Sequence, residues 1–148
     1  MDVAYLDESQ LVECWSKGDP TSRMRCSDAF IFSGKADSLA LVDMLLEPGG
    51  CVPPHTDSAE EVVLVLEGTV EAHVGDERGT LEAGGMVLIP AMARHSIRNV
   101  GDGTARMLGF FSGAEVISTF EDSLMPFDMK VFGPEGSGAP GAASDIHG

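Results

Sequence analysis

Four ionisable side chains near the middle of the chain have types and spacings that could do chemistry together. His55 and Asp57 are two residues apart, so on an extended strand both side chains point to the same face. Glu61 is also an even number of residues from His55, so on a strand its side chain would point to the same face. A turn directly after Asp57 would fold Glu61 back opposite His55. A later strand and turn that end just before His95 could carry that imidazole across to the same place. The sequence therefore predicts that these four possible metal ligands meet at one point.

The elements that would position them are short apolar segments separated by turn residues, a pattern typical of an antiparallel all-β protein. Turn residues such as Gly68 and Gly75 accept positive φ or favour tight turns. Many strands at short spacing predict a barrel or a sandwich. The predicted strands are 29–33, 38–47, 61–66, 69–74, 85–90, 95–100 and 104–111. Short helices are expected at 7–17 and 114–124.

Length and charge exclude several classes of function. The 148 residues, of which 43% are hydrophobic, are enough for one compact domain. A formal charge of -15 repels nucleic acid and anionic lipid, so no nucleic-acid or membrane partner is expected. No apolar run approaches the roughly 18 residues of a membrane span, and the first residues lack a basic segment before an apolar one. We therefore expect a cytoplasmic protein, with its three cysteines as free thiols.

Two stretches of the chain resemble the two motifs of the cupin superfamily, over roughly residues 40–111. The first motif corresponds here to Gly49 or Gly50, His55, Asp57, Glu61 and Gly68. The second corresponds to Gly84, Pro90, His95 and Asn99. Two positions depart from the pattern, because Asp57 stands where a second histidine is usual and Met92 stands where a turn glycine is usual. The resemblance is specific for the fold and says little about the substrate.

The resemblance implies a small single-domain cupin, an all-β double-stranded β-helix (jelly-roll) barrel with short N- and C-terminal extensions. We assign residues 1–132 to this single domain and 133–148 to a flexible tail rich in Gly, Pro and Ala. The run 62–66 within a predicted strand is apolar on both faces, so a partner subunit or an N-terminal segment could cover one of them. Together with the dimers common among similar proteins, this predicts a homodimer.

For the site, the resemblance implies that His55, Glu61 and His95 bind a divalent metal ion. Asp57 is then either a fourth ligand through oxygen, a group that orients an imidazole or a bound water, or a general base. Two imidazoles and one carboxylate suit non-haem Fe(II), which we favour, although Mn, Ni, Co and Zn bind similar ligands. Catalytic roles are expected for Asp57 and Glu61.

Three functions follow from this site, all with a small-molecule substrate. The first is a non-haem iron dioxygenase or other oxygenase acting on a chelating enol, diketone or phenol. The second is a non-oxidative isomerase, cyclase or lyase, for example in polyketide or secondary metabolism, in which the metal polarises a carbonyl and Asp57 or Glu61 moves a proton. The third is a ligand-binding cupin without turnover. We rank the oxygenase first, because the ligand set fits it and because the family that the sequence resembles contains many oxygenases.

Overall fold

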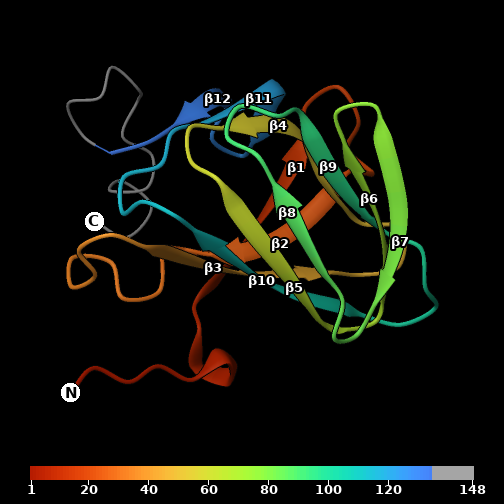
Figure 1. Cartoon of the computed structure of the whole chain (residues 1–148). Helices are drawn as coiled ribbons and strands as arrows, with labels where there is room; N and C mark the ends of the chain where they lie inside the picture. Colours follow the sequence, from red (N-terminus) through yellow and green to blue (C-terminus); the bar gives the residue numbers. More distant parts are fainter. Residues whose placement is uncertain (135–148) are drawn as a thin grey trace.

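The computed structural model describes residues 1–134, which fold almost entirely into β-structure (Figure 1). Within these residues there are twelve strands and one short 3-10 helix, η1. Their bounds are η1 Leu6–Glu8, β1 Leu11–Ser16, β2 Arg23–Ser27, β3 Ala40–Leu46, β4 Cys51–Asp57, β5 Glu61–Glu67, β6 Thr69–Val74, β7 Glu77–Glu82, β8 Met86–Ile89, β9 His95–Asn99, β10 Ala105–Phe111, β11 Ser118–Met125 and β12 Met129–Phe132. No helix in the described part of the chain has the length and apolar character needed to cross a membrane.

The strands form one antiparallel sheet that curls into a barrel, as Figure 1 shows. Its order is β7-β6-β9-β4-β11-β1-β2-β3-β10-β5-β8, with β12 paired to β11. The terminal strands β7 and β8 follow one another in the chain through a tight turn in which Gly84 has φ 91°. Such a conformation favours glycine because it has no Cβ. The architecture is the predicted double-stranded β-helix barrel of the cupin type.

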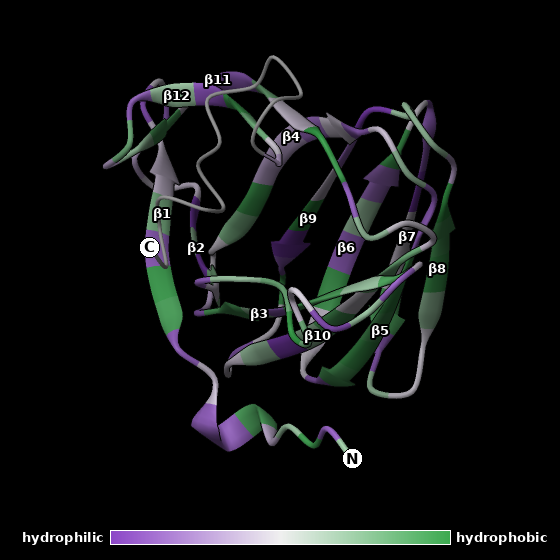
Figure 2. Ribbon diagram, turned by 90° about the vertical axis from the view of Figure 1, so that its left-hand side faces the viewer, coloured by the Kyte–Doolittle hydropathy of each residue, from purple (hydrophilic) through white to green (hydrophobic). Residues whose placement is uncertain are grey.

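The core lies inside the barrel and is built from alternate residues of the strands. On β5, Val63 and Val65 point inward and are 1% exposed, while Val62 and Leu64 point outward and are half-buried. Figure 2 shows that β5 is hydrophobic along its length, whereas hydrophobic and hydrophilic residues alternate along β6. The inward rows of neighbouring strands meet in one main apolar cluster and a smaller one. Four of the eight buried polar residues among those described lie at the site discussed below.

Most of the predicted strands are confirmed, with ends that differ by one or two residues. The segments 38–47, 61–66, 69–74, 85–90, 95–100 and 104–111 correspond to β3, β5, β6, β8, β9 and β10. The segment 29–33 is wrong, since it makes only one isolated bridge, between Ile31 and Leu41, and turns at Phe32 with φ 63°. The predicted segments omit β1, β2, β4, β7, β11 and β12.

Both predicted helices are wrong. The segment 7–17 is mostly β1, which pairs with β2 from Leu11 to Trp15, and only Leu6–Glu8 is helical. The segment 114–124 is largely β11, which pairs with β4 and β12. Hydrogen bonding to neighbouring strands decides the conformation of both segments, against a weak local preference. Of the predicted tail 133–148, residues 135–148 lie outside the described residues.

The turn before His95 contains the methionine that replaces the usual glycine. Met92 has φ 65°, a left-handed conformation that non-glycine residues rarely adopt. Its amide N–H donates a hydrogen bond of 2.8 Å to the carbonyl oxygen of Asp57. The turn therefore connects the two strands that carry the site, and it does so at a cost in backbone strain.

We predict that Met92→Gly raises the free energy of unfolding by up to about 1 kcal/mol, because glycine relieves the left-handed strain. The Met92 side chain is 62% exposed, so its removal costs little buried surface. Thr80→Gly is the matched control, since Thr80 is exposed but lies within the strand β7, where glycine destabilises. Urea unfolding measures both changes. Destabilisation of both variants to the same extent would contradict the predicted strain at Met92.

Candidate metal centre

The structure brings together the residues that the sequence singled out. His55 and Asp57 lie on β4, Glu61 is the first residue of β5, and His95 is the first residue of β9. All four side chains are buried, with exposed fractions of residues between 2% and 7%. His55 and His95 are direct cross-strand partners, and their ring centroids are 4.1 Å apart. The turn after Asp57 returns the chain so that Glu61 faces this pair, as predicted.

The pairing of β4 with β9 is irregular next to the site. Val52 pairs with Ile97 and His55 with His95, so β4 contains one residue more than β9 in this interval. The interval contains Pro53 and Pro54, which have no amide N–H to donate to a ladder. The extra residue is a β-bulge, which re-aims the following side chains. It leaves the carbonyl oxygen of Pro53 available to His55.

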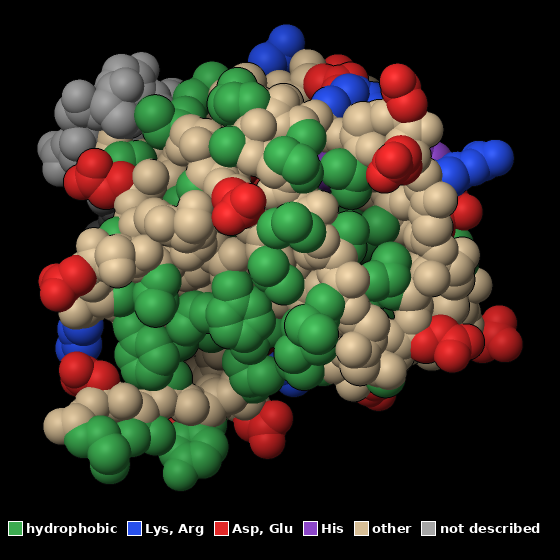
Figure 3. Space-filling view, in the orientation of Figure 1, with side chains coloured by type: hydrophobic (Ala, Val, Ile, Leu, Met, Phe, Trp, Pro, Cys, Tyr) green, Lys and Arg blue, Asp and Glu red, His purple; other side chains and the backbone are tan. Residues whose placement is uncertain are grey.

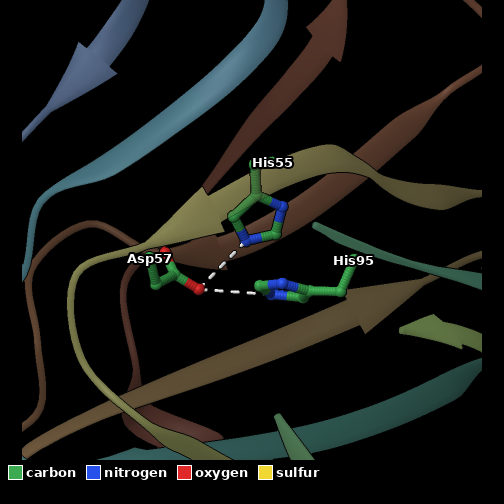
Figure 4. A group of neighbouring side chains, drawn as sticks. All are labelled: His55, Asp57 and His95. Carbon is green, nitrogen blue, oxygen red and sulfur yellow. Dashed lines mark ion pairs between the residues drawn. The ribbon is translucent and has the colours of Figure 1, made fainter. Parts of the chain in front are cut away.

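Asp57 is the centre of the cluster (Figure 4). Its Oδ2 lies 3.3 Å from Nε2 of His55 and 3.2 Å from Nε2 of His95. Glu61 lies slightly farther out, with its Oε1 3.7 Å from the same nitrogen of His95. One ligand atom from each of His55, Asp57 and His95 lies within 4.8 Å of the other two. Such a group of one carboxylate and two imidazoles can hold a metal ion.

The other nitrogen of each imidazole is already bound to the backbone. Nδ1 of His55 is 2.8 Å from the carbonyl oxygen of Pro53, and Nδ1 of His95 is 2.9 Å from that of Ala93. Since a carbonyl only accepts, each Nδ1 must be the protonated donor. In the neutral imidazole the lone pair is then on Nε2, which faces Asp57. Metal-binding histidines are oriented in this way.

Two of the atoms that face the centre have no hydrogen-bond partner among the described residues. These are Oδ2 of Asp57 and Nε2 of His95, which approach within 3.2 Å of each other without the alignment of a hydrogen bond. A buried carboxylate oxygen and a buried imidazole nitrogen without partners are costly. A divalent cation would satisfy both atoms at once, so the residues fit the metal that the fold family implies.

The electrostatics of the cluster favour a positive charge at its centre. Burial disfavours protonation of His95, but the nearby carboxylates of Asp57 and Glu61 outweigh burial and raise its pKa to about 10. Burial also opposes ionisation of Asp57, yet the neighbouring imidazoles and Ser118 hold its pKa well below the usual range. Burial raises the pKa of Glu61. A proton on His95 and a metal ion therefore compete for the same place.

Strand β11 supplies two residues of the site that sequence reasoning missed. Ser118 donates a hydrogen bond of 2.5 Å to Oδ1 of Asp57, which turns Oδ2 toward the imidazoles. Phe120 stacks on His55 with ring centroids 4.5 Å apart and an interplanar angle of 18°. Both were overlooked because this segment was expected to be helical. Val116, Phe120 and Leu124 recur every four residues, which is the spacing of one face of a helix, so the local pattern gives no signal of a strand.

Gly109 of β10 is a third missed residue. A Cβ atom at this position would collide with Oε2 of Glu61 and would lie 2.9 Å from Cγ1 of Val42. The carboxylate of Glu61 thus occupies the space that a side chain at position 109 would fill. Gly109 acts on the site by leaving room for Glu61.

The cluster lies at the inner end of a cavity of about 150 Å³ within the barrel. Its wall is mostly apolar, as in many small-molecule sites. The half-buried residues Asp28, Phe30, Phe127 and Phe132 also line it, which indicates that the cavity reaches the surface near them. The remaining wall includes Val12, Cys14, Met24, Cys26, Val42, Met44, Val52, Val63, Ile97, Phe111, Phe120 and Leu124.

The fold and the cluster define a β-barrel protein with a buried His/Asp/His site at the bottom of an apolar cavity. Residues 42–111, just under half of the chain, match the family described as Cupin domain. The resemblance seen in the two motifs is therefore confirmed.

Known proteins with similar sequences or folds include enzymes. Over 65 residues the chain is 38% identical to the polyketide synthase CurC of Streptomyces cyaneus. This matched stretch covers 43% of this chain and 42% of CurC. The polyketide cyclase RemF of Streptomyces resistomycificus has a similar structure, with a TM-score of 0.60, 21% identity, and coverage of 75% of this chain and 78% of RemF. A protein of Thermotoga maritima described as a predicted oxalate decarboxylase gives a TM-score of 0.65 and 20% identity over 76% of this chain and 99% of its own.

We predict that Gly109→Ala lowers the affinity for a divalent metal ion by about tenfold or more, because Ala displaces a carboxylate at the site. His95→Ala, which removes a ligand, should lose most of the bound metal. Gly79→Ala is the matched control, since an added Cβ there meets nothing within 4 Å. Titration of the metal-free proteins with Zn(II) or Co(II) measures the three affinities. Wild-type affinity in Gly109→Ala would show that Glu61 does not contribute to metal binding.

Proposed function

We propose that the protein is a metal-dependent enzyme that enolises and cyclises a neutral polyketide-type substrate without using oxygen. The observation that carries this proposal is the combination of a buried His/Asp/His cluster with a separate carboxylate, Glu61, beside it. The similarity to a polyketide synthase and to the fold of a polyketide cyclase supports the same chemistry. The matched stretch spans 42% of the length of CurC, so the activity of that whole protein is part of the proposal.

The cavity wall favours a neutral substrate over a small dianion such as oxalate. Within residues 1–134, no Lys or Arg lines the cavity. Asp28, Asp57 and Glu61 line it, so a dicarboxylate would meet like charges with only the metal to offset them. An enol, a 1,3-diketone or a phenol can bind a metal through oxygen and place its carbon skeleton against the apolar wall.

The residues of the cluster then have separate roles. His55, Asp57 and His95 would hold the metal, which supplies Lewis-acid polarisation of a carbonyl oxygen. Glu61 is the carboxylate outside this group, and its Oε1 is 3.7 Å from His95. It is therefore the group to take the proton from the carbon between two carbonyls and return it to oxygen or carbon. Phe120 and the apolar side chains of the wall keep bulk water away from the reacting carbon.

An oxygenase acting on the same substrate class is the second candidate. The observation in its favour is that His55, Asp57 and His95 form a set of two imidazoles and one carboxylate, which suits Fe(II) with open positions. The two candidates differ in what they require. The cyclase works with any Lewis-acidic ion of suitable size, whereas the oxygenase needs a redox-active metal and consumes O₂.

A test uses 3-methylpentane-2,4-dione as a simple 1,3-diketone, under strict exclusion of oxygen. We predict that the Zn(II)-loaded protein accelerates exchange of the central C–H for deuterium, measured by NMR. Glu61→Gln should slow this exchange by about a hundredfold or more, as expected for loss of a general base. It should still load with Zn(II), because His55, Asp57 and His95 remain. The loading should be weaker, because the charge of the nearby Glu61 carboxylate is lost. Glu60→Gln is the matched control, as Glu60 is exposed and adjacent.

The two candidates give opposite results. No exchange with Zn(II), together with loss of the diketone that requires Fe(II) and tracks O₂ consumption, would favour the oxygenase. Exchange at the wild-type rate in Glu61→Gln would remove Glu61 from the proposed role. Absence of stoichiometric metal binding by the wild-type protein would overturn both candidates.

A further inference from the structure

Asp28 lines the cavity outside the metal cluster, and one of its carboxylate oxygens, Oδ1, is buried. Among the described residues, the buried side-chain nitrogen and oxygen atoms without a hydrogen-bond partner are Oδ2 of Asp57, Nε2 of His95 and Oδ1 of Asp28. The first two face the centre of the cluster, and Asp28 lines the same cavity. We propose that Asp28 is a substrate-binding residue that accepts a hydrogen bond from a hydroxyl group of the bound molecule. This inference rests on the proposed function.

The backbone around Asp28 is fixed by hydrogen bonds, so its carboxylate can move only by rotation of the side chain. Asp28 directly follows β2, and its amide N–H donates a hydrogen bond of 2.8 Å to the carbonyl oxygen of Gln10. The preceding residue, Ser27, bonds both to the amide N–H of Asp43, at 2.8 Å, and to its carbonyl oxygen, at 3.4 Å. A group held in this way loses little further entropy when a ligand binds.

The usual structural role of an aspartate in a turn does not account for Oδ1 of Asp28. Asp19 has that role elsewhere in this chain, because its carboxylate accepts hydrogen bonds from Thr21 and Ser22. Oδ1 of Asp28 has no such donor within residues 1–134. A buried acceptor without a donor costs free energy that a ligand can recover.

The chemistry of this atom specifies the ligand. An ionised carboxylate only accepts hydrogen bonds, so its partner must carry an O–H or N–H group. Asp28 is half-buried while the metal cluster is fully buried, so Asp28 lies nearer to the solvent. A substrate with a chelating oxygen pair at one end and a hydroxyl group farther along would be held at both points. Asp28 then selects hydroxylated enols and phenols over unhydroxylated ones of the same size.

The test uses tropolone, a chelating enol of one ring, and its three monohydroxy isomers as probes of the Zn(II)-loaded protein. A cavity of about 150 Å³ can accept one small ring. We predict that the wild-type protein binds at least one hydroxy isomer about tenfold or more tightly than tropolone, as expected for a hydrogen bond to a charged group. Asp28→Ala should lose this preference, while its affinity for tropolone stays within about twofold of wild type. Isothermal titration measures all affinities.

Two further variants control the comparison. Asp37→Ala removes an exposed carboxylate outside the cavity and should keep the wild-type preference. Asp28→Asn keeps an acceptor oxygen without the charge, so it should keep part of the preference for a hydroxy isomer over tropolone. An unchanged preference in Asp28→Ala, or equal affinity of all four probes for the wild-type protein, would overturn the role of Asp28 alone. Failure of the wild-type protein to bind tropolone would overturn the proposed metal-dependent function as well.

A second inference concerns the outer face of the barrel, on a separate observation. The apolar sheet face consists of Val62, Leu64, Met86, Leu88, Leu108 and Phe110. Val62 pairs with Leu88 on one side and Phe110 on the other, and Leu64 pairs in the same way with Met86 and Leu108. These cross-strand neighbours form one continuous patch, visible as clustered hydrophobic side chains in Figure 3. Met86 is 66% exposed, Leu88 59% and Phe110 40%.

We propose that a second copy of this chain covers the apolar sheet face, which gives the predicted homodimer. The chain's own first residues leave the patch exposed, since Met86 and Leu88 remain open to solvent in their presence. Each copy carries a formal charge of -15, so two copies repel one another except through an uncharged surface. The apolar sheet face has no charged side chain, and exposed apolar patches of this kind mark protein interfaces.

The test is the mass of the full chain in solution, measured by light scattering and sedimentation. The wild-type protein should have twice the 15.5 kDa chain mass, and Leu88→Glu and Phe110→Glu should have the mass of one chain. Val100→Glu is the matched control, because Val100 is 48% exposed and outside the patch, and it should stay dimeric. Circular dichroism checks that each variant is folded. A monomeric wild-type protein, or dimers in both patch variants, would contradict the proposal.

Discussion

The structure of this protein depends on one constraint, the burial of the Asp57 carboxylate between two imidazoles. Asp57 is 2% exposed, and an ionised carboxylate at such a depth is costly unless positive charge and hydrogen bonds compensate it. His55 and His95 supply the neighbours, and Ser118 supplies the hydrogen bond. The arrangement of β4, β9 and β11 can be understood as the scaffold that brings these groups to one point.

The backbone contributes as much to the site as the side chains do. Carbonyl oxygens of Pro53 and Ala93 orient the two imidazoles, and the amide of Met92 binds the carbonyl oxygen of Asp57. Each of these groups lies at a bulge or a turn, where the regular ladder does not use it. Irregular positions next to regular strands thus supply the hydrogen bonds that a metal site needs around its ligands.

The sequence predicted the parts of the fold and site that have local signals. The continuous apolar run of β5, the alternation of apolar and polar residues along β6, and the motif spacing of the four possible metal ligands are visible in the chain itself. Ser118 and Phe120 were missed because their contact with the site arises from pairing between β4 and β11, some sixty residues apart in sequence. Asp28 was missed because only the folded cavity distinguishes it from any other aspartate in a turn. The strand β1 was mistaken for a helix because its pairing with β2, and not its composition, decides its conformation.

The close approach of Glu61 to Gly109 means that substitutions at these two positions, which are far apart in the sequence, should be correlated in evolution. An acid one methylene shorter at position 61 would leave a void that a methyl group at position 109 could fill, whereas the longer acid forbids any side chain there. The two residues share a fixed volume, so substitution at one is tolerated only with a matching change at the other. Among descendants of this sequence, glycine at 109 should accompany glutamate at 61, and this joint pattern can be read from aligned chains without a structure.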